Sequence, residues 1–396
     1  MFSTYGRVLS QPGTLAFSAA GLVARIPLAM IGLGIVLLVE HATGSYGRAG
    51  AVSAAYVSAG AVAALVLGRL VDRIGQTVVL PVAVTGQAVS LWLLIQSVER
   101  DWSTWTMFAS AALAGAFLPP IGAAVRTRWS HTLTESSQVQ TAIALESVLD
   151  EVCFIVGPVV VTALATSVSP RAGLVAAIVT GLIGTYALAS QRRTAPPYGA
   201  AHGEASRGPM PWATLVPILV VCVALGSLFG SMEVLTVAFA DERGRPAAAG
   251  WLLALWSLGS LVAGLATGMI AWRVSTATRI RWGAAAMALT MVPLAWVDHL
   301  AAMAALLLVA GLAIAPTLIA TISAVEVCVP RSRLTEGMAL VSTAIVAGLA
   351  PGAALAGMMT DLHGVAGGYL VPVVAGLLGT CAALLVRVHY PADHGE

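Results

Sequence analysis

Residues 68–76 read Gly-Arg-Leu-Val-Asp-Arg-Ile-Gly-Gln, a short charged stretch that links two long apolar runs at residues 47–71 and 77–98. Each run exceeds the roughly 20 residues that an α-helix needs to cross a bilayer. Neither run alternates with a period of two, as a strand would. Backbone groups in hydrocarbon must pair within their own segment, so the runs predict helices. The stretch therefore predicts two membrane-spanning helices joined on one side of the membrane.

Long apolar runs recur along all 396 residues, of which 58% are hydrophobic and 10% charged. Soluble proteins carry about 25% charged residues, so this composition is typical of a membrane protein. We predict an all-α polytopic protein with 12 transmembrane helices in two pseudo-symmetric six-helix bundles. The predicted spans are residues 14–39, 47–71, 77–98, 104–129, 139–166 and 170–190, then 212–240, 247–272, 279–297, 301–327, 334–360 and 366–387. Residues 191–211, rich in Pro, Gly, Arg and Ser, predict a cytoplasmic linker between bundles at 1–190 and 212–396.

The arginines predict the orientation, because cytoplasmic loops carry an excess of basic residues. All 20 basic residues are arginine. With the N-terminus inside, Arg25 lies within a span, and five arginines fall outside: Arg48, Arg100, Arg171, Arg243 and Arg245. The other fourteen fall on the cytoplasmic side. We therefore expect a multi-pass protein of the bacterial inner membrane with both termini cytoplasmic, and no cleaved signal peptide.

Several classes of function find no support in the sequence. The cysteines Cys153, Cys222, Cys328 and Cys381 lie far apart, and the histidines fall in loops, at helix ends or in the tail, so we expect no metal and no cofactor. No nucleophile–base set is visible, which argues against an enzyme, and a net charge of +2 scattered over loops argues against nucleic-acid binding. The expected partners are a small-molecule substrate, protons and the lipid bilayer, and we expect a monomer.

Two short patterns recur about 200 residues apart, which suggests an internal repeat. The run Ser58-Ala59-Gly60 before Gly68 parallels Ser257-Leu258-Gly259 before Gly268. Similarly, residues 144–147 with Gly157-Pro158 parallel residues 339–342 with Pro351-Gly352. Ala/Gly-rich helices resemble one another in any case, but the helix count agrees with a true repeat.

The stretch at residues 68–76 resembles the signature loop of the major facilitator superfamily, a G-x-L-x-D-R-x-G pattern between the second and third helices. The resemblance implies a transporter whose loop latches its halves together on the cytoplasmic side. Gly68 and Gly75 would permit tight turning and close backbone approach. Asp72 would accept hydrogen bonds at a helix N-terminus near Leu334, while Arg73 faces the headgroups. The loop departs from the pattern at Gln76, where a basic residue is common.

The fifth predicted helix contains Gly157-Pro158, a pair found in proton-coupled drug antiporters of this superfamily. There the pair belongs to a longer motif that ends in paired glycines, whereas this chain has Val159-Val160-Val161. The resemblance is partial. A proline kink beside a glycine packing site explains the pair nearly as well.

Five ionisable residues fall inside predicted spans: Arg25, Glu146, Asp150, Glu151 and Glu233. Each charge at the bilayer centre costs at least about 2.5–3.5 kcal/mol and therefore needs a partner, water or neutralisation. One cation cannot neutralise four carboxylates, so some of these acids are expected to bind protons during a transport cycle. We interpret Arg25, Glu146, Asp150 and Glu151 as a proton-coupling and ion-pair group.

Geometry predicts which of these groups meet. Glu146 and Asp150 share one helical face, while Glu151 is turned about 100° from Asp150. Arg25 and Asp150 reach similar depths, so an Arg25–Asp150 or Arg25–Glu146 ion pair is predicted, either static or proton-carrying. Arg126, at the end of its span, is either a cytoplasmic anchor or a partner of Asp72 or Glu146.

By the resemblance, the first, fourth, seventh and tenth helices enclose a substrate cavity. Candidate cavity residues are Met30, Phe117, Phe229, Met232, Glu233 and Thr317. A mostly apolar cavity suits a small hydrophobic or amphipathic molecule. We predict proton-coupled export of such a molecule by alternating access. The alternative is proton-coupled uptake or exchange of a small metabolite, and a membrane enzyme or sensor is disfavoured.

Overall fold

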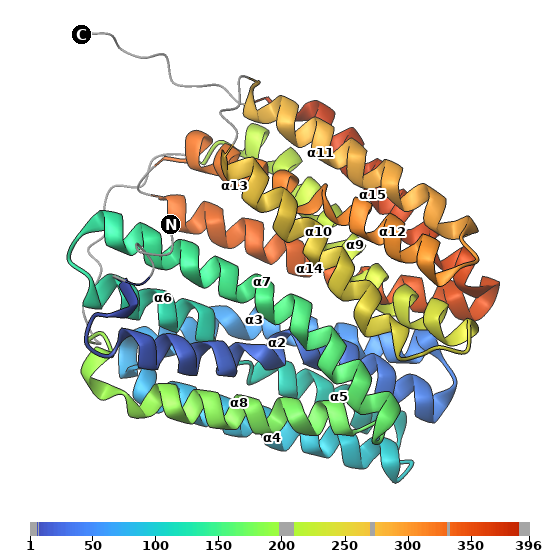
Figure 1. The fold of residues 1–396 in the computed structure, drawn as a ribbon, viewed down its shortest axis with the longest axis horizontal. Coiled ribbons are helices and arrows are strands. Elements are labelled where there is room, and N and C mark those ends of the chain that lie inside the picture. Colours follow the sequence, from blue (N-terminus) through green and yellow to red (C-terminus); the bar gives the residue numbers. More distant parts are fainter. Residues whose placement is uncertain (1–5, 7, 198–209, 270–273, 331–332, 388–396) are drawn as a thin grey trace. The chain divides into compact units, whose positions relative to one another are not determined.

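The computed structural model describes residues 6, 8–197, 210–269, 274–330 and 333–387. Within these ranges every regular element is a helix (Figure 1). Ten segments are long and apolar enough to cross a membrane. The shorter helices α11 (Thr276–Met291) and α15 (Leu370–Leu385) occupy the positions of the ninth and twelfth predicted spans. The prediction of an all-α polytopic protein with 12 spans is confirmed.

The first half of the chain supplies six predicted spans in seven α-helices. They are α2 (Thr14–Thr43), α3 (Tyr46–Ile74), α4 (Gln76–Glu99), α5 (Thr104–Ala116), α6 (Ile121–Thr132), α7 (Ser136–Ser167) and α8 (Ala172–Ser190). A 3-10 turn, η1 (Arg192–Thr194), follows, and Thr194 is buried. Arg192 and Arg193 are exposed, so within the described start of the predicted linker only Thr194 is buried.

The second half supplies the other six spans. They are α9 (Trp212–Glu242), α10 (Ala248–Met269), α11, the 3-10 helix η2 (Val292–Trp296), α12 (Leu300–Gly311), α13 (Ile314–Cys328), α14 (Leu334–Gly368) and α15. The end of the eighth predicted span, at residues 270–272, lies outside the described residues. The ninth predicted span divides into α11 and η2, where Pro293 stands near the start of the 3-10 helix.

The chain forms two compact units that do not coincide fully with its two halves. Unit 1 contains residues Met1–Ser45, Ala55–Ala201 and Arg245–Ala254, and unit 2 contains Tyr46–Ala54, His202–Gly244 and Leu255–Glu396. The first turns of α3 thus belong to unit 2. Asp361 of α14 explains this, because its carboxylate accepts hydrogen bonds from the backbone N–H groups of Tyr46 and Gly47, each at 2.8 Å. An acidic side chain at a helix N-terminus satisfies its free N–H groups.

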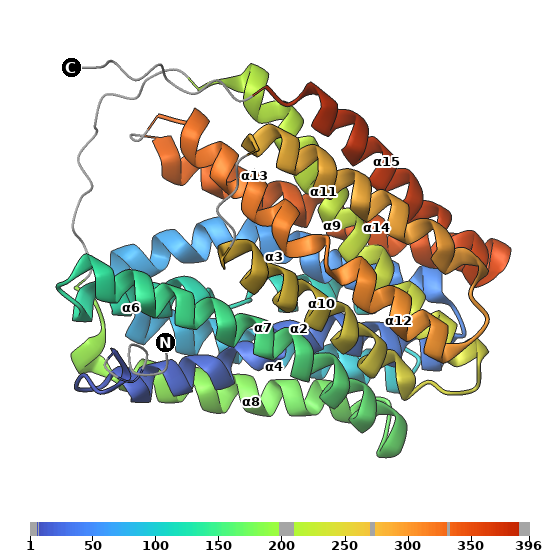
Figure 2. The ribbon, with the colours of Figure 1, turned by 45° about the horizontal axis from the view of Figure 1, so that its top comes forward.

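The fourth span of each half is broken in the middle. In unit 1 the break between α5 and α6 follows Phe117 and contains Pro119 and Pro120, as the paired prolines predict. In unit 2, α12 ends at Gly311 and α13 begins at Ile314 (Figure 2).

The same close contact of glycines accompanies both breaks. A Cβ added at Gly115 would overlap the backbone of Tyr56 and approach Gly60, and one added at Gly311 would overlap Trp256 and approach Gly259. Small residues at a helix interface let backbones approach closely. The matching positions of Gly60 and Gly259 support the internal repeat.

Glycines also press α2 against its neighbours in unit 1. A Cβ added at Gly184 of α8 would overlap the backbone of Ala24, and one added at Gly157 of α7 would lie 2.7 Å from the Cβ of Ala29. In both views α2 runs beside α8 (Figures 1 and 2). These two contacts fix α2 on either side of Arg25.

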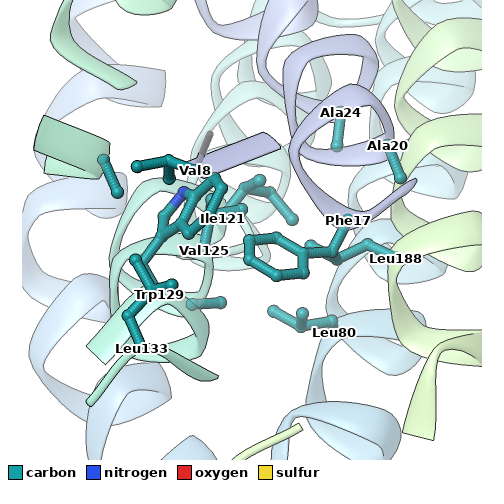
Figure 3. Close-up of a cluster of buried hydrophobic side chains, with 12 residues drawn as sticks. Val8, Phe17, Ala20, Ala24, Leu80, Ile121, Val125, Trp129, Leu133 and Leu188 are labelled. Carbon is teal, nitrogen blue, oxygen red and sulfur yellow. The ribbon is translucent and has the colours of Figure 1, made fainter. Parts of the chain in front are cut away.

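A buried apolar cluster joins helices α2, α4, α6 and α8 of unit 1 (Figure 3). Phe17 of α2 meets Trp129 of α6 edge-to-face, with ring centroids 4.6 Å apart. Leu80 of α4 and Leu188 of α8 pack around them. Because aromatic pairs of this geometry add to the energy of burial, the cluster holds α6 and its polar side chains against α2.

Candidate functional site

The predicted intramembrane charges of unit 1 meet in one cluster. We call Arg25, Arg126, Glu146 and Asp150 the charge cluster. Arg25 comes from α2, Arg126 from α6, and the two acids lie one turn apart on α7. Glu146 and Asp150 are four residues apart on α7, a spacing that places their side chains on one face of the helix.

Arg25 lies at the centre of the cluster with a side chain only 3% exposed. Its Nη1 donates to Asp150 Oδ1 at 2.7 Å, and its Nη2 pairs with Glu146 Oε2. Its Nε donates to the carbonyl oxygen of Gly21, one turn earlier, at 3.1 Å. The sequence predicted an ion pair with one acid or the other, and Arg25 contacts both. The planar guanidinium, with its five donors, suits this bridging position.

Glu146 is fully buried and its two oxygens have three donors in total. Besides Arg25, Ser18 Oγ donates to Oε1 at 2.9 Å and Trp129 Nε1 donates to the same oxygen at 2.7 Å. The indole N–H and the guanidinium can only donate. Glu146 is therefore held as an acceptor on both oxygens, an arrangement that fits the carboxylate form.

The cluster opens at Asp150, whose side chain is 28% exposed. Arg126, 42% exposed, donates from Nη2 to Asp150 Oδ2 at 2.8 Å. Each oxygen of Asp150 thus faces its own guanidinium. Arg126 was predicted to be either a cytoplasmic anchor or a partner of Asp72 or Glu146, and its acid in the structure is Asp150.

Arg126 changes the charge balance that the sequence suggested. Two guanidinium groups face two carboxylates in the cluster, so its formal charge is zero. The predicted acidic excess over a single arginine is wrong for Glu146 and Asp150, because α6 brings a second cation to α7. The two predicted intramembrane acids that lack a cation among the described residues, Glu151 and Glu233, lie outside this cluster.

Glu151 and Glu233 remain without a charged partner. Both side chains are partly buried, and within the described residues neither makes a hydrogen bond or an ion pair. Glu151 adjoins Asp150 on α7 but is turned from it by the helical rotation of about 100° per residue. Glu233 lies in α9 of unit 2. The coupling role of Glu151 and the cavity role of Glu233 stay predictions.

The candidate cavity residues differ in exposure. Met30, Met232 and Thr317 are fully buried, while Phe117 and Phe229 are partly buried. These placements have local explanations in packing. Phe117 ends α5 against Gly86, Phe229 meets Trp256 edge-to-face at 5.6 Å, and Thr317 Oγ1 donates to the carbonyl of Ala313 at 2.6 Å. A cavity role for these side chains stays a prediction.

Two surface pockets lie away from the charge cluster. One of about 610 Å³ in unit 1 has His41, Glu99, Asp101 and Arg171 in its wall, and one of about 270 Å³ in unit 2 has Glu242, Arg243, Asp298 and His363. None of the candidate cavity residues lines either pocket. Both pockets lie at helix ends, so neither identifies a substrate path.

The signature loop is more helical than its glycines suggested. Gly68, Asp72 and Arg73 lie in the last turns of α3, and both charged side chains are exposed. A Cβ added at Gly68 would meet nothing within 4 Å among the described residues, and the close approach expected there stays a prediction. Gly75 does turn the chain, with φ at 91°. The predicted contact of Asp72 with the helix near Leu334 would join the two units and stays a prediction.

The departure from the family pattern at Gln76 has a structural reason. Gln76 is buried, and its Oε1 accepts a hydrogen bond from Nε of Arg128, a fully buried cation, at 2.8 Å. Arg128 Nη1 also donates to the carbonyl oxygen of Gln191, just after α8, and to Thr194 Oγ1, each at 3.0 Å. The carbonyl end of a helix favours a cation. A basic residue at position 76 would face Arg128 with a like charge.

We expect a Gln76→Arg variant to lose about 1–3 kcal/mol of folding free energy, since it removes a buried acceptor and adds a like charge. Gln76→Met is the matched control, because it loses the hydrogen bonds without adding charge. Thermal unfolding of the two purified variants in detergent measures the difference. If both variants melt at the same temperature, charge repulsion at this position is refuted.

Gly157 and Pro158 both serve close packing in unit 1. Gly157 faces Ala29 of α2, as described above. A Cβ added at Gly250, in the first turns of α10, would overlap the carbonyl of Pro158. These contacts agree with the packing interpretation of the pair, and its resemblance to the antiporter motif stays a prediction.

Sequence reasoning missed Ser18 and Trp129, the two neutral donors to Glu146. Ser18 precedes Arg25 by seven residues, which is two helical turns. The two side chains therefore lie on the same face of α2, and this spacing could have predicted that Ser18 reaches the same acids. Trp129 follows Arg126 by three residues on α6. Its role depends on which helix α6 meets after the Pro119-Pro120 break, and no local pattern signals that.

The fold and the buried charges together define a multi-pass membrane protein of the kind that carries solutes. The chain belongs to the Major Facilitator Superfamily, whose family model matches residues 17–300 and 218–396. It is therefore a transporter rather than an enzyme.

Several solved structures are similar to this chain at low sequence identity. The nucleoside transporter NupG shares 13% identity at a TM-score of 0.72, covering 94% of this chain and 98% of that one. An auto-inhibited POT family peptide transporter shares 11% identity at a TM-score of 0.73, covering 97% of this chain and 98% of that one. The human organic anion transporter MFSD10 shares 16% identity at a TM-score of 0.63, covering 95% of this chain and 100% of that one. A search of curated protein sequences found no match. At these identities the similarity shows the fold alone.

Proposed function

We propose that the chain is a proton-coupled secondary transporter that carries a small amphipathic molecule by alternating access. One observation carries the proposal: a carboxylate at span depth, Asp150, is partly exposed and held by two guanidinium groups. Intramembrane ionisable residues of this kind mark proton and substrate pathways in membrane proteins. The apolar candidates for the cavity support an amphipathic rather than a sugar-like substrate.

The proposal includes the membrane arrangement predicted from the sequence. We place the protein in the bacterial inner membrane with both termini cytoplasmic, on the basis of the arginine distribution. The two six-helix bundles, at residues 1–190 and 212–396, would move against each other about the linker at residues 191–211. Such movement of two repeats is the general mode of transport in this architecture.

Two directions of flux are compatible with this fold. Export in exchange for protons was the first prediction from the sequence. The alternative, proton-coupled uptake or exchange, gains support from Asp150, since neither of its oxygens is free to bind a cationic substrate in competition with a proton. Nucleoside, peptide and organic anion transporters with this fold add support only by analogy.

Purified protein in proteoliposomes tests the proposal. A pH gradient is imposed, and a panel of labelled amphipathic acids, amines and neutral compounds is followed together with an internal pH dye. We expect at least one compound to move against its gradient with a matching pH change, and a protonophore to abolish this movement. Transport that is the same with and without the pH gradient would contradict proton coupling, while the sign of the pH change decides between export and uptake.

A further inference from the structure

The two oxygens of Asp150 are not equivalent. Oδ1 faces Arg25, which is 3% exposed and also holds Glu146. Oδ2 faces Arg126, which is 42% exposed. A guanidinium that the protein does not enclose can be released from its acid, whereas a buried one cannot be left unpaired without a large cost. Oδ2 is therefore the oxygen that can give up its arginine.

Glu146 cannot take this role. Its side chain has no exposed surface, and Arg25, Trp129 and Ser18 already occupy its oxygens. Of these three groups only Ser18 Oγ could accept from a protonated carboxyl, and protonation of Glu146 would take from the buried Arg25 one of its two acids. A proton that reaches the cluster would consequently bind at Asp150.

Protonation of Asp150 alters the charge of the whole cluster. Among the described residues, the charged and titratable side chains around Asp150 are Arg25 from α2, Arg126 from α6, and Glu146, Glu151 and Cys153 from α7 itself. The cluster is neutral as two cations and two anions, so one added proton leaves a single positive charge. That charge lies on the released Arg126, at the exposed end of the cluster.

We propose that Arg126, once Asp150 Oδ2 is protonated, binds the carboxylate of a singly charged organic anion. The planar guanidinium matches a carboxylate with two parallel hydrogen bonds, and one negative charge restores neutrality. The inference rests on the proposed function and names its substrate class: an amphipathic monocarboxylate. Because the coupling is reciprocal, the anion strengthens proton binding as much as the proton strengthens anion binding. Proton and anion would then travel together.

A matched set of three aromatic probes tests the binding site at equilibrium: benzoate, benzamide and benzylamine. Their binding to the purified full chain in detergent is measured by calorimetry at about pH 5.5 and about pH 8, where benzoate is ionised throughout. We expect benzoate to bind about tenfold more tightly at the lower pH. Benzamide should show no pH dependence. Benzylamine binding that strengthens at the higher pH would overturn the assignment and indicate a cation site.

Variants separate the roles of the two residues. Asp150→Asn mimics the protonated side chain, so its benzoate affinity should be high and independent of pH. Arg126→Gln should lose at least about tenfold in benzoate affinity, and Arg126→Lys should fall between, because a lysine keeps the charge without the planar pair of donors. Arg171→Gln is the control: Arg171 is also an exposed arginine paired with an acid, Glu99, at 2.9 Å in unit 1. It should bind benzoate as the unmodified protein does.

Failure of this inference can be distinguished from failure of the proposed function. Benzoate binding that survives Arg126→Gln in a folded protein refutes the anion site, even if proteoliposomes show proton-coupled transport of another compound. Conversely, proton-independent transport refutes the proposed function, while the binding measurements still report on the site. Thermal unfolding of each variant shows that it is folded before binding is compared.

Discussion

An Arg25→Met variant is expected to lose about 3–5 kcal/mol of folding free energy, because it leaves Glu146 as a buried charge without a cation. Glu146 has no exposed surface, and its remaining donors, Ser18 and Trp129, are neutral. Asp150 would keep Arg126 as a partner. The measurement is unfolding of the purified protein in detergent, followed by heat or denaturant. Transport should fall with stability, since α2 loses its charged link to α7 and, at Glu146, keeps only the hydrogen bond from Ser18.

The double variant Arg25→Met/Glu146→Gln provides the control for charge. It removes one cation and one anion, so the remaining Arg126–Asp150 pair stays neutral, and the glutamine oxygen can still accept from Trp129 and Ser18. Replacing a buried pair as a whole is often neutral in energy, unlike breaking it. We expect the double variant to regain most of the lost stability. A double variant as unstable as Arg25→Met alone would show that the packing of Arg25, rather than its charge, holds the helices.

The fold was predictable where hydrophobic length determines it. Each long apolar run became helical, whole or in two segments, because a helix satisfies the backbone of a run within hydrocarbon. The break before Ile121 was signalled by Pro119 and Pro120. The break after Gly311 has only Pro316, in the first turn of α13, as a local signal, and it also accompanies the approach of Gly311 to Trp256 on another helix. Contacts of this kind depend on tertiary packing and do not appear in a single-sequence pattern.

The candidate site was predictable where helix geometry alone determines which side chains meet. Depth along the helix placed Arg25 with the acids of α7, and the four-residue spacing put Glu146 and Asp150 on one face. Arg126 was assigned to the membrane surface because it lies near the end of its span. The direction of α6 after the broken segment decides where its side chains point, and that brought Arg126 to Asp150 instead. The cluster is consequently neutral, which changes the inferred substrate from a generic amphipath to an anion.

The contact between α8 and α2 should be the most sensitive packing contact near the cluster. Gly184 meets the backbone of Val23 and Ala24, directly before Arg25, and a Cβ there would overlap atoms that cannot rotate away. We expect Gly184→Ala to cost about 1–3 kcal/mol of folding free energy, as overpacking does in well-packed interiors. Since the helices must separate, Arg25 should move relative to the acids of α7, and transport should fall as well.

Gly181→Ala is the matched control, one turn earlier on the same helix. A Cβ at Gly181 would lie 3.3 Å from the ring of Pro27 and 3.7 Å from Val84, side-chain contacts that small shifts can relieve. Both variants replace a glycine of α8 by alanine, so the change in helix propensity is the same in each and cancels in the comparison. The melting temperature of Gly184→Ala should therefore fall well below that of Gly181→Ala. Equal melting temperatures would mean that α8 does not press on α2 at Ala24, and that the position of Arg25 is set by its ion pairs alone.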